Sequence, residues 1–411
     1  MNPRIQLDTD GQSVAVCEGF RIRSAFQPII SVAHQRVVGY EGLARVTDES
    51  GQAIPPDALF ARIHELPHLV AVDRACRELH LTNFARMQFY PRWIFINVHP
   101  LVAMHGHQFG PFFANILEEL QIEGSQVVVE LVESALVDER QLRSAIDLYR
   151  SLGCLVALDD FGISGSQFTR LWRIDADIVK LDRSLIAEAE HSARARRTLP
   201  SLTAMVHEAG SLVLQEGIET PVQLALALNA GVDLLQGFGL ARPALLDQAE
   251  PFDRAFLAEG LRQTSLETDR ADFDLHQQIQ AVTERFEDML VAIERGVSVD
   301  KAARALLSMH LVARVFVLDG SGRQLGETVH GAFAPQTQHS RFQPLLQAEG
   351  ASWVKRPYFR RAMIDPGVVQ ISRPYLSVAG GNLCRTLSYC RAHVPDSGIK
   401  VVCCDLNWAD D

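Results

Sequence analysis

The sequence predicts an α/β protein: a (β/α)8-type barrel with an antiparallel first strand, followed by linker helices and a small α+β domain. Up to about residue 245, short apolar runs rich in β-branched residues alternate with longer amphipathic stretches. The runs are almost continuously apolar, which is typical of strands buried on both faces. The eight runs are 25–30, 37–43, 93–98, 127–132, 155–160, 177–182, 212–217 and 233–240.

The first two runs differ from the others in their connection. Only the residues SVAHQR (31–36) separate them, and a parallel pair of strands needs a crossover of about a dozen residues or more. These two strands are therefore expected to form an antiparallel hairpin. The later connections are long enough for helices, and two of them, 139–153 and 194–210, end at Gly153 and Gly210, which suit helix C-caps.

The pattern changes at about residue 251. A long, charged, helix-periodic stretch indicates connecting helices, and it is interrupted at Gly296. Strand signals return at 314–329, where a Gly-containing turn joins two strands, and they continue to the end of the chain. The expected division is a barrel at 1–250, connecting helices at 251–310 and a small α+β domain at 311–411.

Composition limits the classes of function. The chain has 39 Lys+Arg against 50 Asp+Glu, and a net charge of −11 argues against a general nucleic-acid binder, which would carry a basic footprint. Neither a signal peptide nor an apolar run of the ~18–20 residues that a membrane span needs is apparent, so we expect a cytoplasmic protein. The 7 cysteines show no C-x-x-C spacing, which argues against a disulfide framework and a zinc site.

Polar groups lie within or directly after the apolar runs. In a barrel of parallel strands, such groups converge on one mouth. Carboxylate and amide oxygens suit one or two Mg²⁺ or Mn²⁺ ions, and two metals ~3.5–4 Å apart can activate water for an in-line phosphoryl displacement. A lysine there could polarise the water or neutralise charge on the phosphate. The residues are Glu41, Asn97, Glu130, Asp159, Asp160, Lys180, Glu216 and Gln236.

Other interpretations of these residues remain open at this point. Asp160 or Asn97 could cap the helix that follows its strand, and Glu130 could form a purely structural salt bridge with Lys180. Carboxylates and a lysine at strand ends would also suit enolase-type proton abstraction or a Schiff-base aldolase. Polar groups at so many successive strand ends nevertheless favour a site over repeated coincidence.

Eight short motifs follow one another in order between about residues 15 and 250. They are QPI (27–29), YEGLAR (40–45), FINV (95–98), ELVES (130–134), LDDFG (158–162), VKLDRSLI (179–186), EGIET (216–220) and QGFGLARP (236–243). Together they resemble the EAL family of bacterial cyclic di-GMP phosphodiesterases, which act in second-messenger signal transduction. The resemblance implies hydrolysis of cyclic di-GMP to linear pGpG with two Mg²⁺ or Mn²⁺ ions per site.

The resemblance also implies roles for individual residues. Lys180 matches the catalytic lysine near the nucleophilic water, and Glu41 and Asp160 are grouped with it as catalytic. The expected metal ligands are Glu41, Asn97, Glu130, Asp159, Asp160 and Glu216. The expected substrate-binding residues are Gln27 and Leu43 at the guanine pocket, Arg45 at a phosphate, and Gln236, which supports the site. Glu133 matches the glutamate that holds the loop after the sixth barrel strand.

Three departures from the family pattern are visible. The signature reads Glu41-Gly42-Leu43 instead of Glu-Ala-Leu, and Gln215 replaces the usual small residue before Glu216. Residues 160–168 read DFGISGSQF, where active members usually read like DFGTGYSSL. Because that loop shapes metal binding and dimerisation in the family, the alternative function is a catalytically weak or inactive EAL-type receptor that binds cyclic di-GMP and signals by conformational change.

The C-terminal part carries four further motifs: VFVLDGSGR (315–323), RPYFRRAM (356–363), ISRPYLSV (371–378) and GIKVVCCDLNW (398–408). These resemble PAS/Cache-type sensor domains. The resemblance implies a small-molecule pocket at Arg356, Tyr358, Tyr375 and Asp405, in which Arg356 would take a carboxylate and Asp405 an ammonium. The same residues could instead only stabilise the fold. A barrel of this family joined to such a domain also implies a homodimer.

Overall fold

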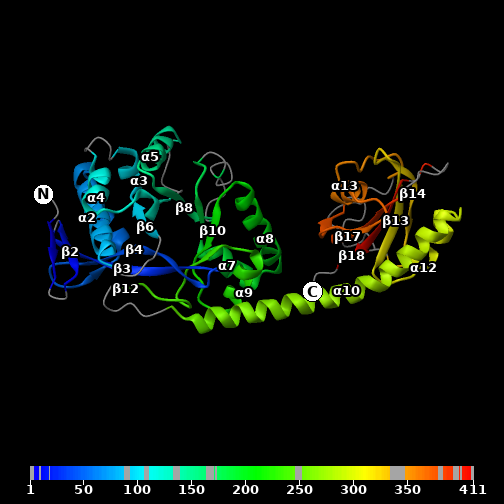
Figure 1. Cartoon of the computed structure of the whole chain (residues 1–411), viewed down its shortest axis with the longest axis horizontal. Helices are drawn as coiled ribbons and strands as arrows, with labels where there is room; N and C mark the ends of the chain where they lie inside the picture. The colour runs from blue at the N-terminus through cyan, green and yellow to red at the C-terminus, as the bar shows by residue number, and fades with distance from the viewer. Residues whose placement is uncertain are drawn as a thin grey trace. The chain divides into compact units, whose positions relative to one another are not determined.

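The computed structural model divides the chain into two compact units, Met1–Glu267 and Thr268–Asp411 (Figure 1). Each unit has its own sheet and core. The domain boundaries expected at residues 250 and 310 stay predictions. The structure describes residues 4–8, 11–17, 19–87, 93–105, 111–132, 139–162, 171, 174–245, 252–333, 348–377, 383–391, 398 and 400–408.

The first unit contains a closed eight-stranded barrel, as the sequence predicts. Each of the eight apolar runs overlaps one of its strands, and the last strand pairs back with the first. In spatial order the strands are β3 (Phe20–Ser31), β4 (Arg36–Thr47), β6 (Trp93–Val98), β7 (Val127–Val132), β8 (Leu155–Phe161), β9 (Ile178–Leu181), β10 (Leu212–Gln215) and β11 (Leu234–Leu235).

Strand β3 runs antiparallel to both of its barrel neighbours, β4 and β11. The remaining pairs around the barrel are parallel. The antiparallel first strand is therefore confirmed. Its register with β4 sets Gln27 directly opposite Glu41, which brings two of the predicted site residues together.

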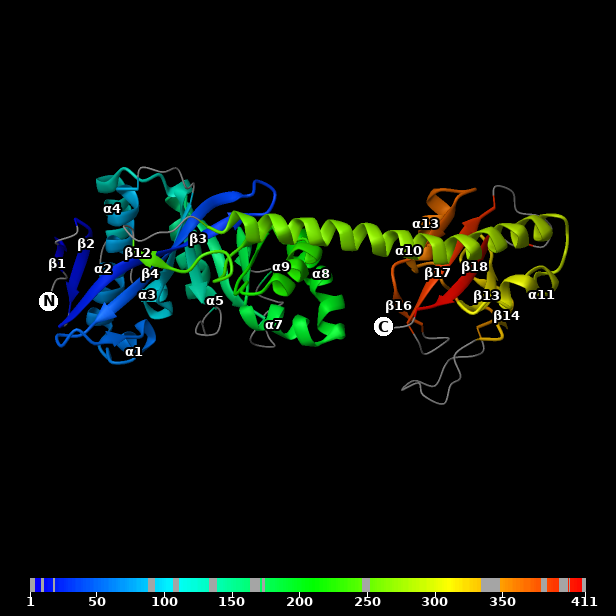
Figure 2. The same cartoon turned by 90° about the horizontal axis from the view of Figure 1, so that it is seen from below.

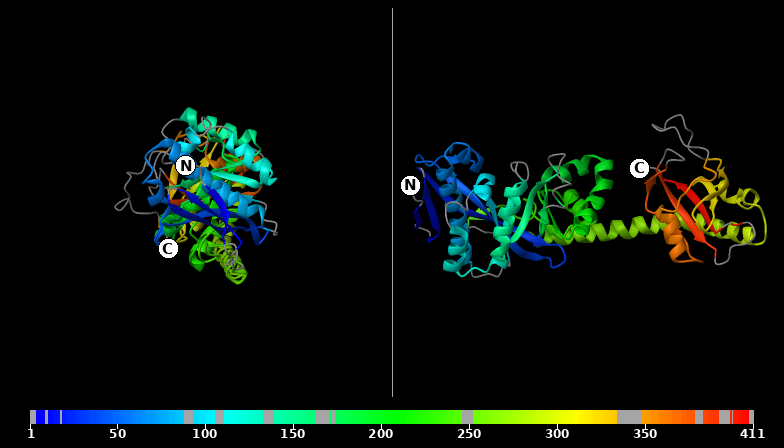
Figure 3. Two further views of the ribbon diagram at one scale, coloured as in Figure 1. Left: turned by 90° about the vertical axis from the view of Figure 1, so that its left-hand side faces the viewer. Right: turned by 90° about the horizontal axis from the view of Figure 1, so that it is seen from above.

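Helices surround the barrel strands (Figures 1 and 3). They cover it with the apolar faces that form the main core of the unit. Gly153 and Gly210, just beyond α5 and α8, have φ of 81° and 92°, as expected of glycines that end helices. The helices are α1 (Pro56–Phe60), α2 (Leu66–Ala85), α3 (Pro100–His105), α4 (Phe112–Leu120), α5 (Glu139–Ser151), α7 (Arg183–His191), α8 (Ala193–Glu208), α9 (Pro221–Ala230) and the 3-10 helix η2 (Gly124–Gln126).

Four short strands extend the sheet outside the barrel, and the sequence analysis did not predict them. Two of them pair at the ends of β3 and β4, one pairs beside the middle of β3, and one pairs with another short strand. Three of them are short or largely exposed, so they carry little of the apolar signal that marks the barrel strands. They are β1 (Arg4–Leu7), β2 (Ser13–Cys17), β5 (Ala53–Ile54) and β12 (Ala244–Leu245).

The second unit is built on one antiparallel sheet (Figures 1 and 2). Its strand order is β14-β13-β18-β17-β15, and β16 pairs with β17. The strands lie in the runs that the sequence marked. They are β13 (Val312–Leu318), β14 (Gln324–His330), β15 (Val369–Ile371), β16 (Tyr375–Leu376), β17 (Leu383–Cys390) and β18 (Val401–Asn407).

Alternate residues of β13 and β18 face two separate cores of the second unit. Val315 and Val317 pack with helix α10 (Arg254–Glu294) and α12 (Arg304–Leu307), whereas Phe316 and Leu318 pack with α13 (Pro357–Ile364). Both faces of the sheet are therefore covered. A short helix, α11 (Val299–Ala302), precedes α12. No helix within the described residues combines the length and the apolarity that a membrane crossing requires.

Candidate active site

The interior of the barrel consists of an apolar layer below a polar one. Because alternate residues of a strand point to the same side, the residue two positions further along each parallel strand enters the barrel next; on antiparallel β3 it lies two positions earlier. The apolar layer consists of Ile29, Phe95, Val128, Ala157, Ile178, Leu214 and Leu234. The corresponding polar residues are Gln27, Asn97, Glu130, Asp159, Lys180, Glu216 and Gln236.

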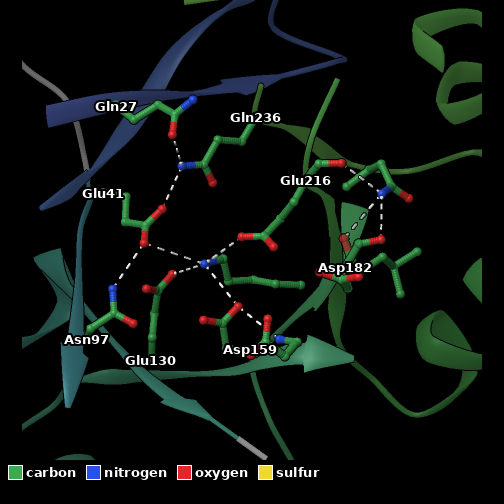
Figure 4. A network of polar contacts seen from close by, with 12 residues as sticks. Gln27, Glu41, Asn97, Glu130, Asp159, Asp182, Glu216 and Gln236 are labelled. Atoms are coloured by element: carbon green, nitrogen blue, oxygen red, sulfur yellow. Dashed lines mark hydrogen bonds and ion pairs between the residues drawn. The ribbon is translucent and has the colours of Figure 1, made fainter. Parts of the chain in front are cut away.

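Lys180 lies at the centre of the polar layer and is 1% exposed. Its Nζ is 2.7 Å from Glu130 Oε1, 2.8 Å from Glu216 Oε1 and 3.1 Å from Asp159 Oδ1. Glu41 Oε1 is 3.8 Å away, and Figure 4 shows these carboxylates converging on one ammonium group. Burial opposes the charge, but the carboxylates, led by Asp159, raise the pKa of Lys180 well above its usual value. Lys180 is therefore an ammonium ion.

Two side-chain amides hold Glu41 in place (Figure 4). Asn97 Nδ2 donates to Glu41 Oε1 at 3.0 Å, and Gln236 Nε2 donates to Glu41 Oε2 at 2.6 Å. Gln236 Nε2 also donates to Gln27 Oε1 at 3.1 Å. Burial favours the neutral acid, but Lys180 and the two amides outweigh it and lower the pKa of Glu41. Glu41 is thus a fixed, ionised carboxylate.

Glu130 is fully buried, and only one of its two carboxylate oxygens faces a described cation. Its Oε1 contacts Lys180, whereas its Oε2 accepts no hydrogen bond from any described residue. Burial and the neighbouring charge of Glu41 raise the pKa of Glu130 well above its usual value. A buried carboxylate oxygen without a donor is costly, and a cation would satisfy it.

Asp159 and Asp160 both reach the mouth because the β8–β9 pairing shifts register between Leu158 and Phe161. Asp160 has a φ of 58°, in the left-handed region that a non-glycine residue rarely adopts. Carboxylate oxygens of Asp159, Asp160 and Glu216 lie within 4.8 Å of one another. Burial, followed by the charge of Asp159, raises the pKa of Asp160. Burial raises the pKa of Glu216 to about 7, against the opposing effect of Lys180.

The oxygen atoms at the mouth suit a hard divalent cation. Five carboxylates surround a single ammonium group, so the mouth carries more negative charge than Lys180 can balance. The potential metal ligands among the described residues are carboxylate and amide oxygens, which Mg²⁺, Mn²⁺ and Ca²⁺ prefer. Glu130 Oε2, which accepts no hydrogen bond from a described residue, is one of them. The six predicted metal-ligand residues are all part of this set.

Leu43 and Arg45 line a pocket of about 690 Å³ that opens beside Glu41 and Asn97. The sequence did not single out its other walls, Phe60 and His99 among them. Phe60 lies in helix α1 and His99 follows strand β6. Neither residue stands in a sequence pattern that predicts a binding site. Gln236 contacts Glu41 from inside the barrel, and Gln27 contacts Gln236.

Gly42 is explained by its neighbour His80 on α2. A Cβ built on Gly42 would lie 3.0 Å from His80 Cγ. His80 is buried, and its Nδ1 lies 2.8 Å from Ser24 Oγ. The glycine of the Glu41-Gly42-Leu43 signature therefore leaves room for an imidazole that lies 38 positions further along the chain.

Gln215 links the ends of two strands. Its Nε2 donates to the carbonyl oxygens of Glu216 at 3.0 Å, Leu181 at 3.2 Å and Asp182 at 3.4 Å. The side chain is fully buried. A small residue here could make none of these bonds. Glu133 and residues 163–168 of the altered loop lie outside the described residues.

In the second unit, the structure brings Arg356, Tyr358, Tyr375 and Asp405 to one cavity. Tyr358 and Tyr375 stack with ring centroids 5.9 Å apart. Asp405, for which the sequence suggested an ammonium partner, pairs with Arg314, which the sequence analysis did not select. The two face each other across β13 and β18, a register that the single sequence does not reveal.

Comparison with known proteins gives one family and several relatives. The EAL domain family matches residues 13–243. The uncharacterized EAL-domain containing protein YkuI of Bacillus subtilis (strain 168) is 26% identical over 387 residues, which cover 89% of this chain and 90% of YkuI. The crystal structure of YkuI, in complex with cyclic di-GMP and calcium, matches with a TM-score of 0.77 and 24% identity over 95% of this chain and 97% of YkuI.

Two relatives from Escherichia coli (strain K12) match only the barrel part. The probable cyclic di-GMP phosphodiesterase PdeN is 27% identical over 226 residues, 54% of this chain and 43% of PdeN. The cyclic di-GMP phosphodiesterase PdeF is 27% identical over 221 residues, 52% of this chain and 30% of PdeF. The chain thus spans less than half of the length of either. The family match covers more than half of this chain, and the chain therefore belongs to the EAL domain family.

Proposed function

We propose that this protein is a phosphodiesterase that hydrolyses one phosphodiester bond of cyclic di-GMP and gives linear pGpG. The observation that carries the proposal is the set of carboxylates and amides around Lys180 at the mouth of the barrel. The relatives support it, because PdeF and PdeN are named for this activity and YkuI was crystallised with cyclic di-GMP.

Two Mg²⁺ or Mn²⁺ ions are the proposed cofactors. The residues that would hold them are Glu41, Asn97, Glu130, Asp159, Asp160 and Glu216. When bound, such ions lower the pKa of water and stabilise charge on a phosphate. The excess of carboxylates and the calcium in the YkuI crystals support a divalent cation at this mouth.

Lys180 is proposed to act as a charged donor. Because its pKa is raised, it keeps its proton at neutral pH and cannot serve as the base. It can hold the attacking water by a hydrogen bond and neutralise charge that develops on the phosphate. The water oxygen attacks phosphorus and the bond from phosphorus to the 3′ oxygen breaks. The water loses one proton and the 3′ oxygen gains one, so the products are a 3′ hydroxyl and the 5′-phosphate of pGpG.

The pocket beside Glu41 is proposed to receive one guanylate half of the substrate. Arg45 would contact a phosphate oxygen, and Leu43 would pack on the base. Gln27 is proposed to contact the guanine from the opposite strand while its carbonyl oxygen accepts from Gln236. Asn97 and Gln236 position Glu41 and do not need to touch the substrate.

The second candidate is a receptor that binds cyclic di-GMP without turning it over. The departure at residues 160–168 favours it. The test is incubation of the full chain with cyclic di-GMP and Mg²⁺ or Mn²⁺, with pGpG followed by chromatography. Metal-dependent pGpG that disappears with chelator supports the enzyme. Saturable binding without product supports the receptor, and the absence of both contradicts the two proposals.

The second unit is proposed to be a PAS/Cache-like regulatory domain that binds a small molecule, and the protein is proposed to be a homodimer. An antiparallel sheet covered by helices on both faces supports a compact sensor domain. The cavity lined by Arg356, Tyr358, Tyr375 and Asp405 supports a ligand site. Sedimentation velocity of the full chain tests the dimer.

A further inference from the structure

The end of strand β6 carries Asn97, whose amide holds Glu41 (Figure 4). In the described sheet, this end of the strand is supported mainly from one side. The pairing of β6 with β7 continues to Val98. The pairing of β6 with β4 ends earlier, at Ile96. The direction of the Asn97 amide therefore depends on what else fixes the chain at this point.

Asp73 of helix α2 supplies a contact just beyond the strand. Its Oδ1 accepts a hydrogen bond from the backbone N–H of His99 at 2.8 Å. His99 is the residue that follows β6, and Asp73 is 3% exposed. A hydrogen bond to a buried, ionised carboxylate is stronger than one between neutral groups. Asp73 thereby fixes the backbone shortly after Asn97.

Arg77, one turn further along α2, holds Asp73 in this orientation. Its Nε donates to Asp73 Oδ2 at 2.7 Å, and its Nη2 lies 2.6 Å from the same oxygen. Burial opposes the charge of Arg77, but Asp73 outweighs it and raises the pKa of Arg77. The guanidinium carbon lies 5.4 Å from the ring centroid of Phe112 and 5.5 Å from that of Phe113. Oδ2 is thus bound by Arg77, while Oδ1 faces the backbone of His99.

Stability alone does not explain this ion pair. Arg77 is as buried as Asp73, and a buried ion pair is often no more stabilising than apolar side chains of similar volume. Apolar side chains could not accept the hydrogen bond from His99, however. Asp73 and His99 also line the pocket that opens beside Glu41 and Asn97. What the pair provides is a charged acceptor at a defined place next to the site.

We propose that Asp73 is a positioning residue for the metal site. Through the backbone of His99 it holds the end of β6, and with it the amide of Asn97 that keeps Glu41 in place. Arg77 contributes by orienting Asp73. This inference rests on the proposed function, because Asn97 and Glu41 are proposed metal ligands, but its test does not require hydrolysis.

The test replaces the ion pair by apolar residues. In the double variant Asp73→Ala with Arg77→Met, the protein should stay folded while His99 loses its acceptor. Calorimetry of the full chain should show Mn²⁺ binding weakened by at least about tenfold, the usual scale for a group that supports a metal ligand. The Mn²⁺ concentration for half-maximal pGpG formation should rise by the same factor. Saturating Mn²⁺ should restore most of the turnover.

A second double variant separates the acceptor from the charge. In Asp73→Asn with Arg77→Gln, the side-chain oxygen of the asparagine can accept from His99 while its amide group donates to the glutamine. Both charges are gone, but the hydrogen bond to the end of β6 can form. Mn²⁺ affinity should therefore return most of the way to the wild-type value.

Asp177 provides a matched control. Its Oδ2 also accepts from a backbone N–H, that of Val156, at 2.8 Å. Val156 lies within β8 and pairs with Val129 of β7, so the sheet itself holds it. Asp177→Ala should lower Tm and leave Mn²⁺ affinity unchanged.

Two results would overturn the proposal. The first is Mn²⁺ binding of wild-type strength in the apolar double variant, with circular dichroism and Tm showing that it is folded. The second is an equal loss of affinity in Asp177→Ala, because the effect would then be a general consequence of lost stability. If the apolar variant does not fold, Mn²⁺ affinity is measured in His99→Pro, which removes the donor N–H, and unchanged affinity there would also overturn the proposal.

The same measurements separate this inference from the proposed hydrolysis. A wild type that binds Mn²⁺ and forms no pGpG would refute only the hydrolysis. A wild type that forms pGpG, with the same Mn²⁺ dependence in the apolar variant, would refute only the role of Asp73. A wild type that binds no Mn²⁺ would contradict both.

Discussion

The chemistry of the barrel mouth depends on one residue, Lys180. Its ammonium group contacts Glu130, Asp159 and Glu216 within 3.1 Å. Lys180 therefore contacts several carboxylates at once and does not form a single ion pair. A single structural pair between Glu130 and Lys180, which the sequence left open, does not describe this arrangement.

Replacing Lys180 by alanine should abolish hydrolysis of cyclic di-GMP but preserve binding of the nucleotide. We expect Lys180→Ala to lower pGpG formation by at least about 100-fold, because a preorganised charge at a reacting phosphate contributes on that scale. Binding of cyclic di-GMP in the presence of Ca²⁺, measured by calorimetry, should change by only a few fold. Wild-type turnover in this variant would refute the assigned role of Lys180.

Gly42 and His80 should behave as a coupled pair. In Gly42→Ala the new methyl group would lie 3.0 Å from His80 Cγ, and overpacking of this kind costs about 1–3 kcal/mol of unfolding free energy. In the presence of His80→Ala the same substitution should cost much less. Urea unfolding of the four proteins of this double-mutant cycle measures the coupling. Additive effects would contradict the contact.

His80 should also make stability depend on pH. Burial, with a smaller effect from Arg45 and against that of Glu41, lowers its pKa from 6.5 to about 4. Below pH 6.5 the unfolded chain therefore binds a proton that the folded protein does not. The free energy of unfolding should fall by up to about 3 kcal/mol between pH 6.5 and 4, and no further from this group below pH 4.

The variant His80→Asn isolates this effect from the titration of the carboxylates. Urea unfolding at pH 7.5, 6, 5 and 4 should show a smaller pH-dependent loss in His80→Asn than in the wild type. His68→Asn, at an exposed position of the same helix, serves as the control and should follow the wild type. Identical pH profiles for His80→Asn and the wild type would contradict the buried neutral imidazole.

At the scale of elements, the site depends on how the strand ends are held. The register shift of β8 brings Asp159 and Asp160 to the mouth together, and Gln215 ties the end of β10 to that of β9. The polar layer is therefore a product of strand register. Seven of its side chains enter the mouth because each lies two residues from an apolar interior position of the barrel.

Gln215→Ala tests the link between β9 and β10. The substitution removes the donor shared by the carbonyl groups of Leu181, Asp182 and Glu216, and it leaves a buried gap. We expect a loss of about 1–3 kcal/mol in the free energy of unfolding. If Gln215 only supports the strands, pGpG formation should stay within a few fold of wild type. Unchanged stability would show that the three contacts contribute nothing.

The same elements show what a single sequence could predict. The eight barrel strands and the polar strand ends were predictable, because each strand is a buried apolar run with a polar residue at a fixed spacing. The pairing of Arg314 with Asp405 and the contact of Gly42 with His80 were not, because they depend on register and helix packing between distant segments. The short strand β5 carries too few residues for any period to be detected.

At the scale of the whole molecule, the chain joins a barrel of the EAL domain family to a second compact unit. Among the described residues, the mouth of the barrel brings more carboxylates than cations together. This arrangement fits divalent metal ions.

The most direct test of the account is the formation of pGpG from cyclic di-GMP by the full chain as Mn²⁺ or Mg²⁺ is titrated. The account predicts no product in chelator, product that rises and saturates with metal, and no comparable product from Lys180→Ala at any metal concentration. Product that forms equally well in chelator would contradict the metal-holding role of the carboxylates. Binding of cyclic di-GMP without product at saturating metal would contradict the proposed hydrolysis and leave a receptor.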